Sequence, residues 1–160
     1  MTSTSPFRGS SRHPASWFGT LGRTPRLLNA GGSQRLTNAV VAMDLHPGGA
    51  FVTLMSENGR PFTPHVSACF VDVAPGERIV FTNALTVGWR PATSFYPAPL
   101  TAVLSSTDHP DGTNYVCDVM HGNSADCRKH EELGFFEGWG TVIAQLAAVV
   151  EAQAVVNTGR

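Results

Sequence analysis

Apolar and polar residues alternate in short runs through the middle of the chain. Turn-forming residues separate these runs, as in His46-Pro47-Gly48-Gly49 and in the Asn-Gly pair that begins at Asn58. Short connections of this kind favour one antiparallel sheet of about six strands. The predicted strands are Thr37–Leu45, Ala50–Met55, Val66–Val73, Arg78–Leu85, Leu100–Ser106 and Asn114–Met120.

The last part of the chain changes to a helical period. Asn123 and Ser124 offer an N-cap for a first helix, which Gly134 is expected to interrupt. A second helix from Phe135 to Ala154 would be about 30 Å long, enough to cross a small domain. Its apolar positions recur three and four residues apart, at Phe136, Trp139, Ile143, Leu146 and Val150. Because only the sheet is large enough to cover this stripe, we expect the helix to pack on the sheet.

One connection in the predicted sheet is longer than the others. Residues 86–99 carry three prolines and the aromatic residues Trp89, Phe95 and Tyr96. Loops of this length in a compact domain are often functional, whereas aromatic residues also serve as core filling. The sequence leaves both interpretations open.

Composition indicates one globular domain preceded by an unusual leader. The chain has 160 residues, of which 42% are hydrophobic and 14% charged, with a formal net charge of -1. Residues 1–43 nevertheless hold five arginines and no acidic residue, and they are rich in Ser, Thr, Gly and Pro. We interpret residues 1–36 as an atypical leader rich in Arg, Ser and Gly, which the sequence allows to be either disordered or ordered, and residues 37–156 as the domain. An organellar transit peptide is the alternative for the leader.

Charge and cysteine content limit the kinds of partner and the cellular compartment that we expect for the protein. The net charge of the chain is close to zero, so it lacks the excess of positive charge that is typical of nucleic-acid-binding proteins. No apolar run is long enough to span a membrane. Three cysteines are an odd number, which argues against a disulfide scaffold and favours the reducing cytoplasm. Cys117, His121, Cys127 and His130 are spaced as C-x3-H-x5-C-x2-H, which is not a recurrent zinc pattern. We therefore predict no metal and no cofactor.

Four blocks of the chain, in order, resemble the SRPBCC (START-like) superfamily, and within it the group related to the activator of the heat-shock-protein-90 ATPase. The blocks are Met43–Phe51, Glu77–Ala84, Gly88–Pro91 and His130–Gly140. The resemblance covers about Val40 to Val150 and implies the α+β helix-grip fold. In that fold a curved antiparallel sheet wraps around a long C-terminal helix, with a cavity between them. Members are variously labelled polyketide cyclase or dehydrase, lipid carrier or co-chaperone-like.

Two departures from the family pattern have consequences. Residues 1–38 lack the usual opening strand and tryptophan pattern, of which Trp17-Phe18 would be a remnant. A missing strand would leave an unpaired sheet edge and favour a homodimer. Phe136 stands where many relatives carry a polar residue or histidine, which would make the cavity more apolar.

A cavity of this kind predicts binding of a hydrophobic or aromatic small molecule. Its expected walls are Trp89, Tyr115, Met120, Phe135, Phe136 and Trp139. Alternation along the strand puts Tyr115 and Met120 on opposite faces, so only one of them can face the helix, and we favour Tyr115.

The catalytic alternative is a cyclase-like enzyme that uses a cavity histidine as general acid or base. Its candidates are His65, His121 and Glu137, although no triad, nucleophile elbow or phosphate loop accompanies them. A chaperone-associated interaction module is the third possibility, with an acidic helical region that includes Glu131 and Glu132. Ligand binding is the function that the sequence favours.

Overall fold

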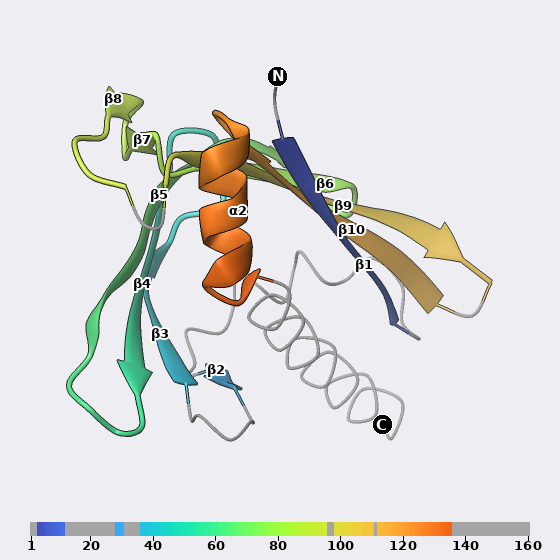
Figure 1. Cartoon of the computed structure of the whole chain (residues 1–160). Coiled ribbons are helices and arrows are strands. Elements are labelled where there is room, and N and C mark those ends of the chain that lie inside the picture. Colours follow the sequence, from blue (N-terminus) through green and yellow to red (C-terminus); the bar gives the residue numbers. More distant parts are fainter. Residues whose placement is uncertain (1–2, 12–27, 31–35, 96–97, 111, 136–160) are drawn as a thin grey trace, which may run out of the picture.

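The computed structural model describes residues 3–11, 28–30, 36–95, 98–110 and 112–135. Within this part, eight strands form one antiparallel sheet in the order β1-β10-β9-β6-β5-β4-β3-β2 (Figure 1). These strands are β1 Ser3–Ser11, β2 Leu28–Ala30, β3 Leu36–Met43, β4 Ala50–Glu57, β5 Thr63–Ala74, β6 Arg78–Thr82, β9 Leu100–His109 and β10 Gly112–His121. A separate small hairpin joins β7, Leu85–Thr86, to β8, Arg90–Pro91.

All six strands predicted from the alternating pattern are confirmed, as β3, β4, β5, β6, β9 and β10. The structure adds two strands from the stretch that the sequence analysis set apart as a leader. Strand β1 pairs with β10 along its whole length, and β2 pairs with β3. Because β1 pairs along the edge of β10, the opening strand is present and the condition for that unpaired edge is not met. The homodimer stays a prediction.

Glycines with positive φ shape the turns between the strands. Asn58 and Gly59 have φ values of 52° and 75°, which is the combination that a type I′ hairpin turn requires. Gly76 at φ 78° lies in the Ala74–Glu77 turn, which is closed by the backbone N–H of Glu77 donating to Ala74. The turn predicted at Asn58 and Gly59 is confirmed.

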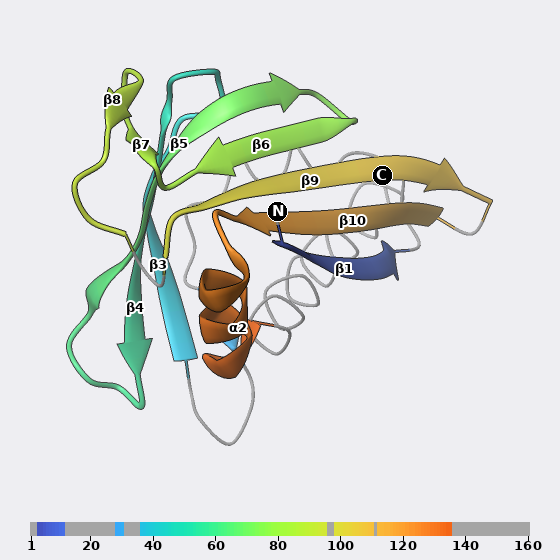
Figure 2. The ribbon, with the colours of Figure 1, turned by 45° about the horizontal axis from the view of Figure 1, so that its top comes forward.

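The sheet is strongly curved, and its apolar residues gather on the concave face. Strands β3, β4 and β5 run down one side of the bend, while β9, β10 and β1 extend across the top (Figures 1 and 2). The buried core on this face comprises Ala68, Phe70, Ile79, Phe81, Ala102, Cys117, Val119 and Phe135. Phe51 extends this core, because its ring stacks on Phe70 at 5.6 Å and meets Phe81 edge-on at 5.1 Å.

Helix α2, Ser124–Glu132, lies inside the bend of the sheet and contacts β10 and β1 (Figure 2). Its start is set by the predicted N-cap, since the Asn123 side chain accepts a hydrogen bond from the Asp126 backbone at 2.9 Å. Its end is set by Gly134, whose φ of 86° stops the helix and lets its N–H bond back to Glu131. The predicted interruption at Gly134 is therefore confirmed.

The predicted long helix lies outside the described residues, apart from Phe135 at its start. The same holds for Trp17-Phe18 in the leader and for Tyr96 in the long connection. Phe135 itself is 3% exposed and packs into the core of the concave face. The chain thus reaches the sheet again directly after α2.

Candidate functional site

Imidazoles meet at one end of the apolar concave face. His121 is the last residue of β10 and is 2% exposed, and its Nε2 lies 2.9 Å from Nδ1 of His130 on α2. The two rings cross almost perpendicularly, with centroids 5.1 Å apart. At this distance the two nitrogens share a hydrogen bond, one donating and the other accepting.

Local sequence explains why these two histidines face each other. The turn at Gly122 and Asn123 ends β10 and starts α2 at once, so the helix returns over the strand that precedes it. Cys127 and His130 lie three residues apart and so on one face of the helix. Cys127 is 4% exposed, which marks that face as the one turned toward the sheet.

Phe135 closes the apolar side of the histidine pair. Its ring meets the ring of His130 edge-on, with centroids 4.8 Å apart. Val119, two residues before His121 and on the same face of β10, is fully buried in the core that includes Phe135. The imidazole pair therefore lies directly beside the apolar core.

His65 on β5 is a third histidine that acts electrostatically on His130. Its Nδ1 shares a hydrogen bond of 3.2 Å with the hydroxyl of Thr53 on β4, and that hydroxyl also accepts from the backbone N–H of Val66. A positive charge on His65 lowers the pKa of His130, as the smallest of the causes that act on it. Of the three predicted catalytic candidates, His121 contacts His130 directly, whereas His65 influences the pKa of His130 from β5.

Burial lowers the pKa of two of these imidazoles, His130 and His65. Burial, with His121 and His65 as smaller causes and against the opposing effect of the nearby Glu131, lowers the pKa of His130 to about 4. Burial also lowers the pKa of His65. At neutral pH His130 therefore carries no charge and presents both a hydrogen-bond donor and an acceptor.

Two further titratable groups lie on β10 close to the core. Burial, with Cys117 as a smaller cause, raises the pKa of Tyr115 to about 12. Burial, with the charge of Asp118 as a smaller cause, raises the pKa of Cys117 to about 12. Both groups keep their protons at neutral pH, so they add no charge to the concave face.

The two faces of β10 separate Tyr115 from Met120, as alternation predicts. Strands β9 and β10 pair without a bulge, so the alternation is unbroken. Cys117, Val119 and His121 are at most 2% exposed, and they share the face of Tyr115. Met120 points to the opposite face, which leaves Tyr115 as the candidate on the concave side.

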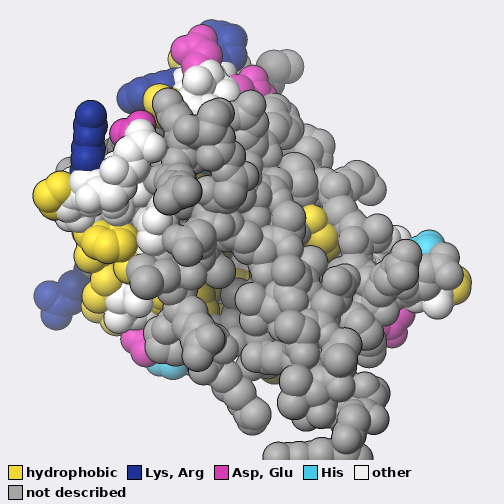
Figure 3. Space-filling view, turned by 90° about the horizontal axis from the view of Figure 1, so that it is seen from below, with side chains coloured by type: hydrophobic (Ala, Val, Ile, Leu, Met, Phe, Trp, Pro, Cys, Tyr) yellow, Lys and Arg dark blue, Asp and Glu magenta, His cyan; other side chains and the backbone are white. Residues whose placement is uncertain are grey.

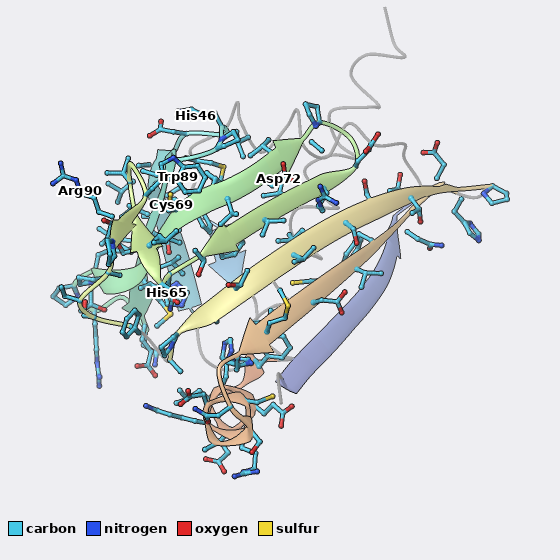
Figure 4. The ribbon with its side chains drawn as sticks, turned by 90° about the horizontal axis from the view of Figure 1, so that it is seen from above. His46, His65, Cys69, Asp72, Trp89 and Arg90 are labelled. Atoms are coloured by element: carbon cyan, nitrogen blue, oxygen red, sulfur yellow. The ribbon has the colours of Figure 1, made fainter. Side chains whose placement is uncertain are left out.

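Trp89, also predicted as a wall of the cavity, lies elsewhere. It sits in the turn of the β7–β8 hairpin with φ 66° and is 48% exposed. Its indole rests against the turn between β3 and β4, since a Cβ added at Gly48 would lie 2.9 Å from its Nε1. Figure 4 shows Trp89 beside the segment that carries His46 and well apart from α2.

The long connection 86–99 is anchored at its two ends. The buried amide of Asn83 donates to the carbonyl of Ala98 at 2.9 Å and accepts from the backbone N–H of Leu100 at 2.8 Å. Between these anchors Val87, Trp89 and Phe95 are each more than 40% exposed. From below, hydrophobic side chains show on the side of the molecule where β4, β5 and the β7–β8 hairpin lie (Figures 1 and 3).

The remaining site predictions fall on residues that the structure does not describe. These are Glu137 as a catalytic candidate, and Phe136 and Trp139 as cavity walls. In the described residues, Cys69, Cys117 and Cys127 form no disulfide, and no group of three or more metal-ligating side chains is gathered.

His130 is the site residue that the sequence analysis did not assign to the cavity. The sequence showed His130 only as the last residue of the C-x3-H-x5-C-x2-H spacing and as the first residue of the segment His130–Gly140 that resembles the family. A signal was available, because Asn123 fixes the start of the helix and places position 130 on the same face as Cys127. The sequence does not, however, show that this face turns back onto β10.

The curved antiparallel sheet with a helix inside its bend defines an α+β protein of the helix-grip class. The family model "Activator of Hsp90 ATPase homolog 1-like protein" matches residues 11–151. The chain therefore belongs to this family within the SRPBCC superfamily, as the sequence resemblance indicated.

Solved structures agree with this assignment. Protein NE0264 from Nitrosomonas europaea is 30% identical, covers 94% of this chain and 95% of its own, and superposes with a TM-score of 0.76. Protein Ms6760 from Mycobacterium smegmatis shares the fold at 19% identity and a TM-score of 0.70, with 91% and 89% covered. A protein from Arthrobacter aurescens does so at 12% identity and a TM-score of 0.73, with 93% and 86% covered.

Two other comparisons are negative. No curated protein matches the chain. Among the described residues, no helix has the length and apolar character needed to cross a membrane.

Proposed function

We propose that the protein binds an apolar small molecule on the concave face of its sheet, with the His121–His130 pair as the polar contact. The observation that carries this proposal is the pair of hydrogen-bonded imidazoles beside an apolar core. Binding sites for small molecules commonly combine apolar walls with a few well-placed polar groups that fix the orientation of the ligand. The family assignment supports ligand binding without naming a ligand.

The described residues divide the predicted cavity walls into two groups. Tyr115 and Phe135 belong to the face that carries the histidines, and we assign them to the binding site. Trp89 and Met120 lie elsewhere, so we leave them out of it. Phe136, Trp139 and Glu137 stay predictions.

General acid–base catalysis is the second candidate function. The 2.9 Å contact between His121 and His130 is a path along which a proton could move between two imidazoles. However, a base whose pKa is about 4 binds a proton only weakly at neutral pH. The site therefore fits binding and orientation of a ligand better than proton abstraction.

Two neighbouring residues of β9 allow a matched test of the binding face. Leu104 packs against the core of the concave face, whereas Val103 points to the opposite face, and both are half-buried. We expect Leu104→Trp to weaken binding of the neutral probe N-phenyl-naphthylamine by about tenfold or more, because the larger side chain fills ligand space. Val103→Trp should change the affinity less than about twofold.

Equilibrium dialysis measures both affinities without interference from the added tryptophans. Cooperative unfolding in urea, checked for both variants, separates lost binding from lost structure. Equal effects of the two substitutions, or no binding of the probe by the unmodified protein, would contradict the proposal.

We also place this function in the cytoplasm. All three cysteines are buried, and none of them forms a disulfide. A reducing compartment keeps thiols in this state, whereas secreted domains of this size commonly use disulfides.

A further inference from the structure

We propose that Asn58 is a site of spontaneous covalent modification, at which the side chain closes onto the backbone nitrogen of Gly59 and is converted to aspartate and isoaspartate. The site is the exposed turn that joins β4 to β5. This modification is independent of ligand binding on the concave face.

The reaction is a ring closure followed by a hydrolysis. Once hydroxide has removed its proton, the nitrogen of Gly59 attacks Cγ of Asn58, and the side-chain amide group leaves as ammonia. Water then opens the imide ring. Opening at Cγ gives aspartate, whereas opening at the main-chain carbonyl carbon gives isoaspartate, in which the backbone runs through the former side chain. Each conversion consumes a water molecule and releases an ammonia molecule, and nothing is oxidised or reduced.

The turn leaves the attacking nitrogen uncrowded. Its closing hydrogen bond runs from the backbone N–H of Arg60 to the carbonyl of Glu57 at 3.0 Å, so closure of the turn does not use the N–H of Gly59. A Cβ added at Gly59 would meet no described atom within 4 Å. Because glycine has no Cβ and adopts positive and negative φ at little cost, Gly59 offers little hindrance to ring closure.

The turn also allows Asn58 to change conformation. Asn58 is exposed and has φ 52°, in the left-handed region that asparagine tolerates better than most residues. Loop tips of this kind open locally at a low cost in free energy. Local opening at the tip lets the side chain of Asn58 approach the nitrogen of Gly59 while the strands stay paired.

The other asparagines of the described chain have less favourable positions for this reaction. The buried amide of Asn83 is held by two hydrogen bonds to backbone groups. Asn123 caps α2 through its side chain and is followed by Ser124, whose side chain hinders ring closure. The rest lie within strands β2, β3 and β10. Asn58 is therefore the position at which exposure, a turn and a following glycine coincide.

Conversion to isoaspartate changes the turn in two ways. It lengthens the main chain between Glu57 and Arg60, which no longer fits the two-residue loop of a type I′ turn. It also places a carboxylate beside that of Glu57, and like charges at this distance repel each other. We expect the pairing of β4 with β5 to loosen first next to the turn, at Met55 and Thr63.

Peptide mapping by mass spectrometry measures the conversion at each asparagine after incubation of the folded protein in neutral buffer. Electron-transfer fragmentation distinguishes isoaspartate from aspartate, and a sample taken before incubation serves as the blank. We expect Asn58 to convert about tenfold faster than Asn123 or more. The rate at Asn58 should rise with pH, because hydroxide removes the amide proton.

Two alanine variants form a matched pair. Gly59→Ala should slow the conversion of Asn58 by about tenfold, because the added Cβ hinders the attacking nitrogen. Gly122→Ala is the control, since Gly122 is also exposed and a Cβ there would meet no described atom within 4 Å. Because Gly122 precedes Asn123 instead of following an asparagine, this substitution should leave the conversion of Asn58 unchanged.

The unmodified protein in urea gives the deciding comparison, which holds even if Gly59→Ala disturbs the turn. In the unfolded chain the conversion of Asn58 depends on its local sequence alone, and we expect the folded protein to convert within about tenfold of that rate. Conversion that is confined to the unfolded chain would show that the turn protects Asn58 and would overturn the proposal. Equal rates at Asn58 and Asn123 in the folded protein would overturn it as well.

Discussion

The α2 end of the sheet and the β7–β8 hairpin both carry ring side chains that the sequence proposed for the site. Those at the α2 end are buried, whereas those at the hairpin are exposed. At the α2 end, His121 and Phe135 are at most 3% exposed, and an imidazole pair lies against the apolar core. At the hairpin, Trp89 is 48% exposed and its backbone has φ 66°, a conformation that a bulky side chain rarely adopts. In the sequence, Trp89 and Phe135 were predicted as cavity walls and His121 as a catalytic candidate.

The difference shows that residue type alone does not define a binding site. A neutral imidazole beside apolar side chains has lost its water and gains from a new partner. An exposed indole that already rests on the backbone of Gly48 has part of its surface covered and the rest in water. The following predictions test whether the two regions differ in this way, from the largest effect to the smallest.

The largest expected difference is in the free energy of unfolding that is lost on replacing Phe135, at the α2 end, and Phe95, in the long connection. Phe135 is 3% exposed and Phe95 is 42% exposed. We expect Phe135→Ala to lower the free energy of unfolding by about 3–5 kcal/mol through loss of buried area and the cavity it leaves. Phe95→Ala should cost less than about 1 kcal/mol. Urea unfolding measures both, and similar losses would show that the α2 end is not the buried one.

Acid should weaken the α2 end specifically. The pKa of His130 is about 4 in the folded protein and 6.5 in its usual environment, so the unfolded chain binds the proton more tightly. The stability that this gives is complete above pH 6.5 and is lost as the pH falls toward 4, by at most about 1.4 kcal/mol per pH unit. Solvent at this half-buried ring reduces that figure.

Urea unfolding at several pH values tests this loss, with two glutamine variants for comparison. His130→Gln should flatten the decline between pH 6.5 and pH 4, whereas His46→Gln, at an exposed histidine, should retain it. A decline that is the same in both variants would assign the acid sensitivity to other groups.

The smallest expected difference in stability concerns Gly48, which lies against the indole of Trp89. Gly48 and Gly59 both have positive φ, at 83° and 75°, but only an added Cβ at Gly48 would meet a neighbour, Nε1 of Trp89 at 2.9 Å. Alanine at Gly59 should cost about 1 kcal/mol from backbone strain alone. Alanine at Gly48 should cost about 1 kcal/mol more and shift the indole N–H resonance of Trp89. Equal costs with an unmoved resonance would mean that Trp89 does not rest on this turn.

Local sequence signals predicted much of the fold. Alternation located the six central strands, the Asn-Gly pair marked its hairpin, and Asn123 and Gly134 marked the limits of α2. Each of these signals acts within a few residues, so tertiary contacts are not needed to recognise it. Strand β1 was missed because its sequence, Ser3–Ser11, contains proline and glycine and has no regular alternation. Its place comes from pairing with β10, more than one hundred residues away.

The site was predicted less completely because it depends on how distant segments meet. His121 was named as a catalytic candidate and Phe135 as a cavity wall, and the structure places both beside His130. Trp89 was assigned by its type, and only the course of the β7–β8 hairpin shows that it faces the β3–β4 turn. The partners of a half-buried side chain follow from the fold, which a local pattern does not contain.

The most direct test is a titration of the ¹⁵N-labelled protein with decanol, followed by amide NMR shifts. The account predicts that the largest shifts occur at Cys117, Val119, His121, His130 and Phe135, while residues 87–90 of the hairpin stay in place. Shifts concentrated at residues 87–90, with the α2 end unchanged, would contradict the central claim and move the binding site to the exposed Trp89.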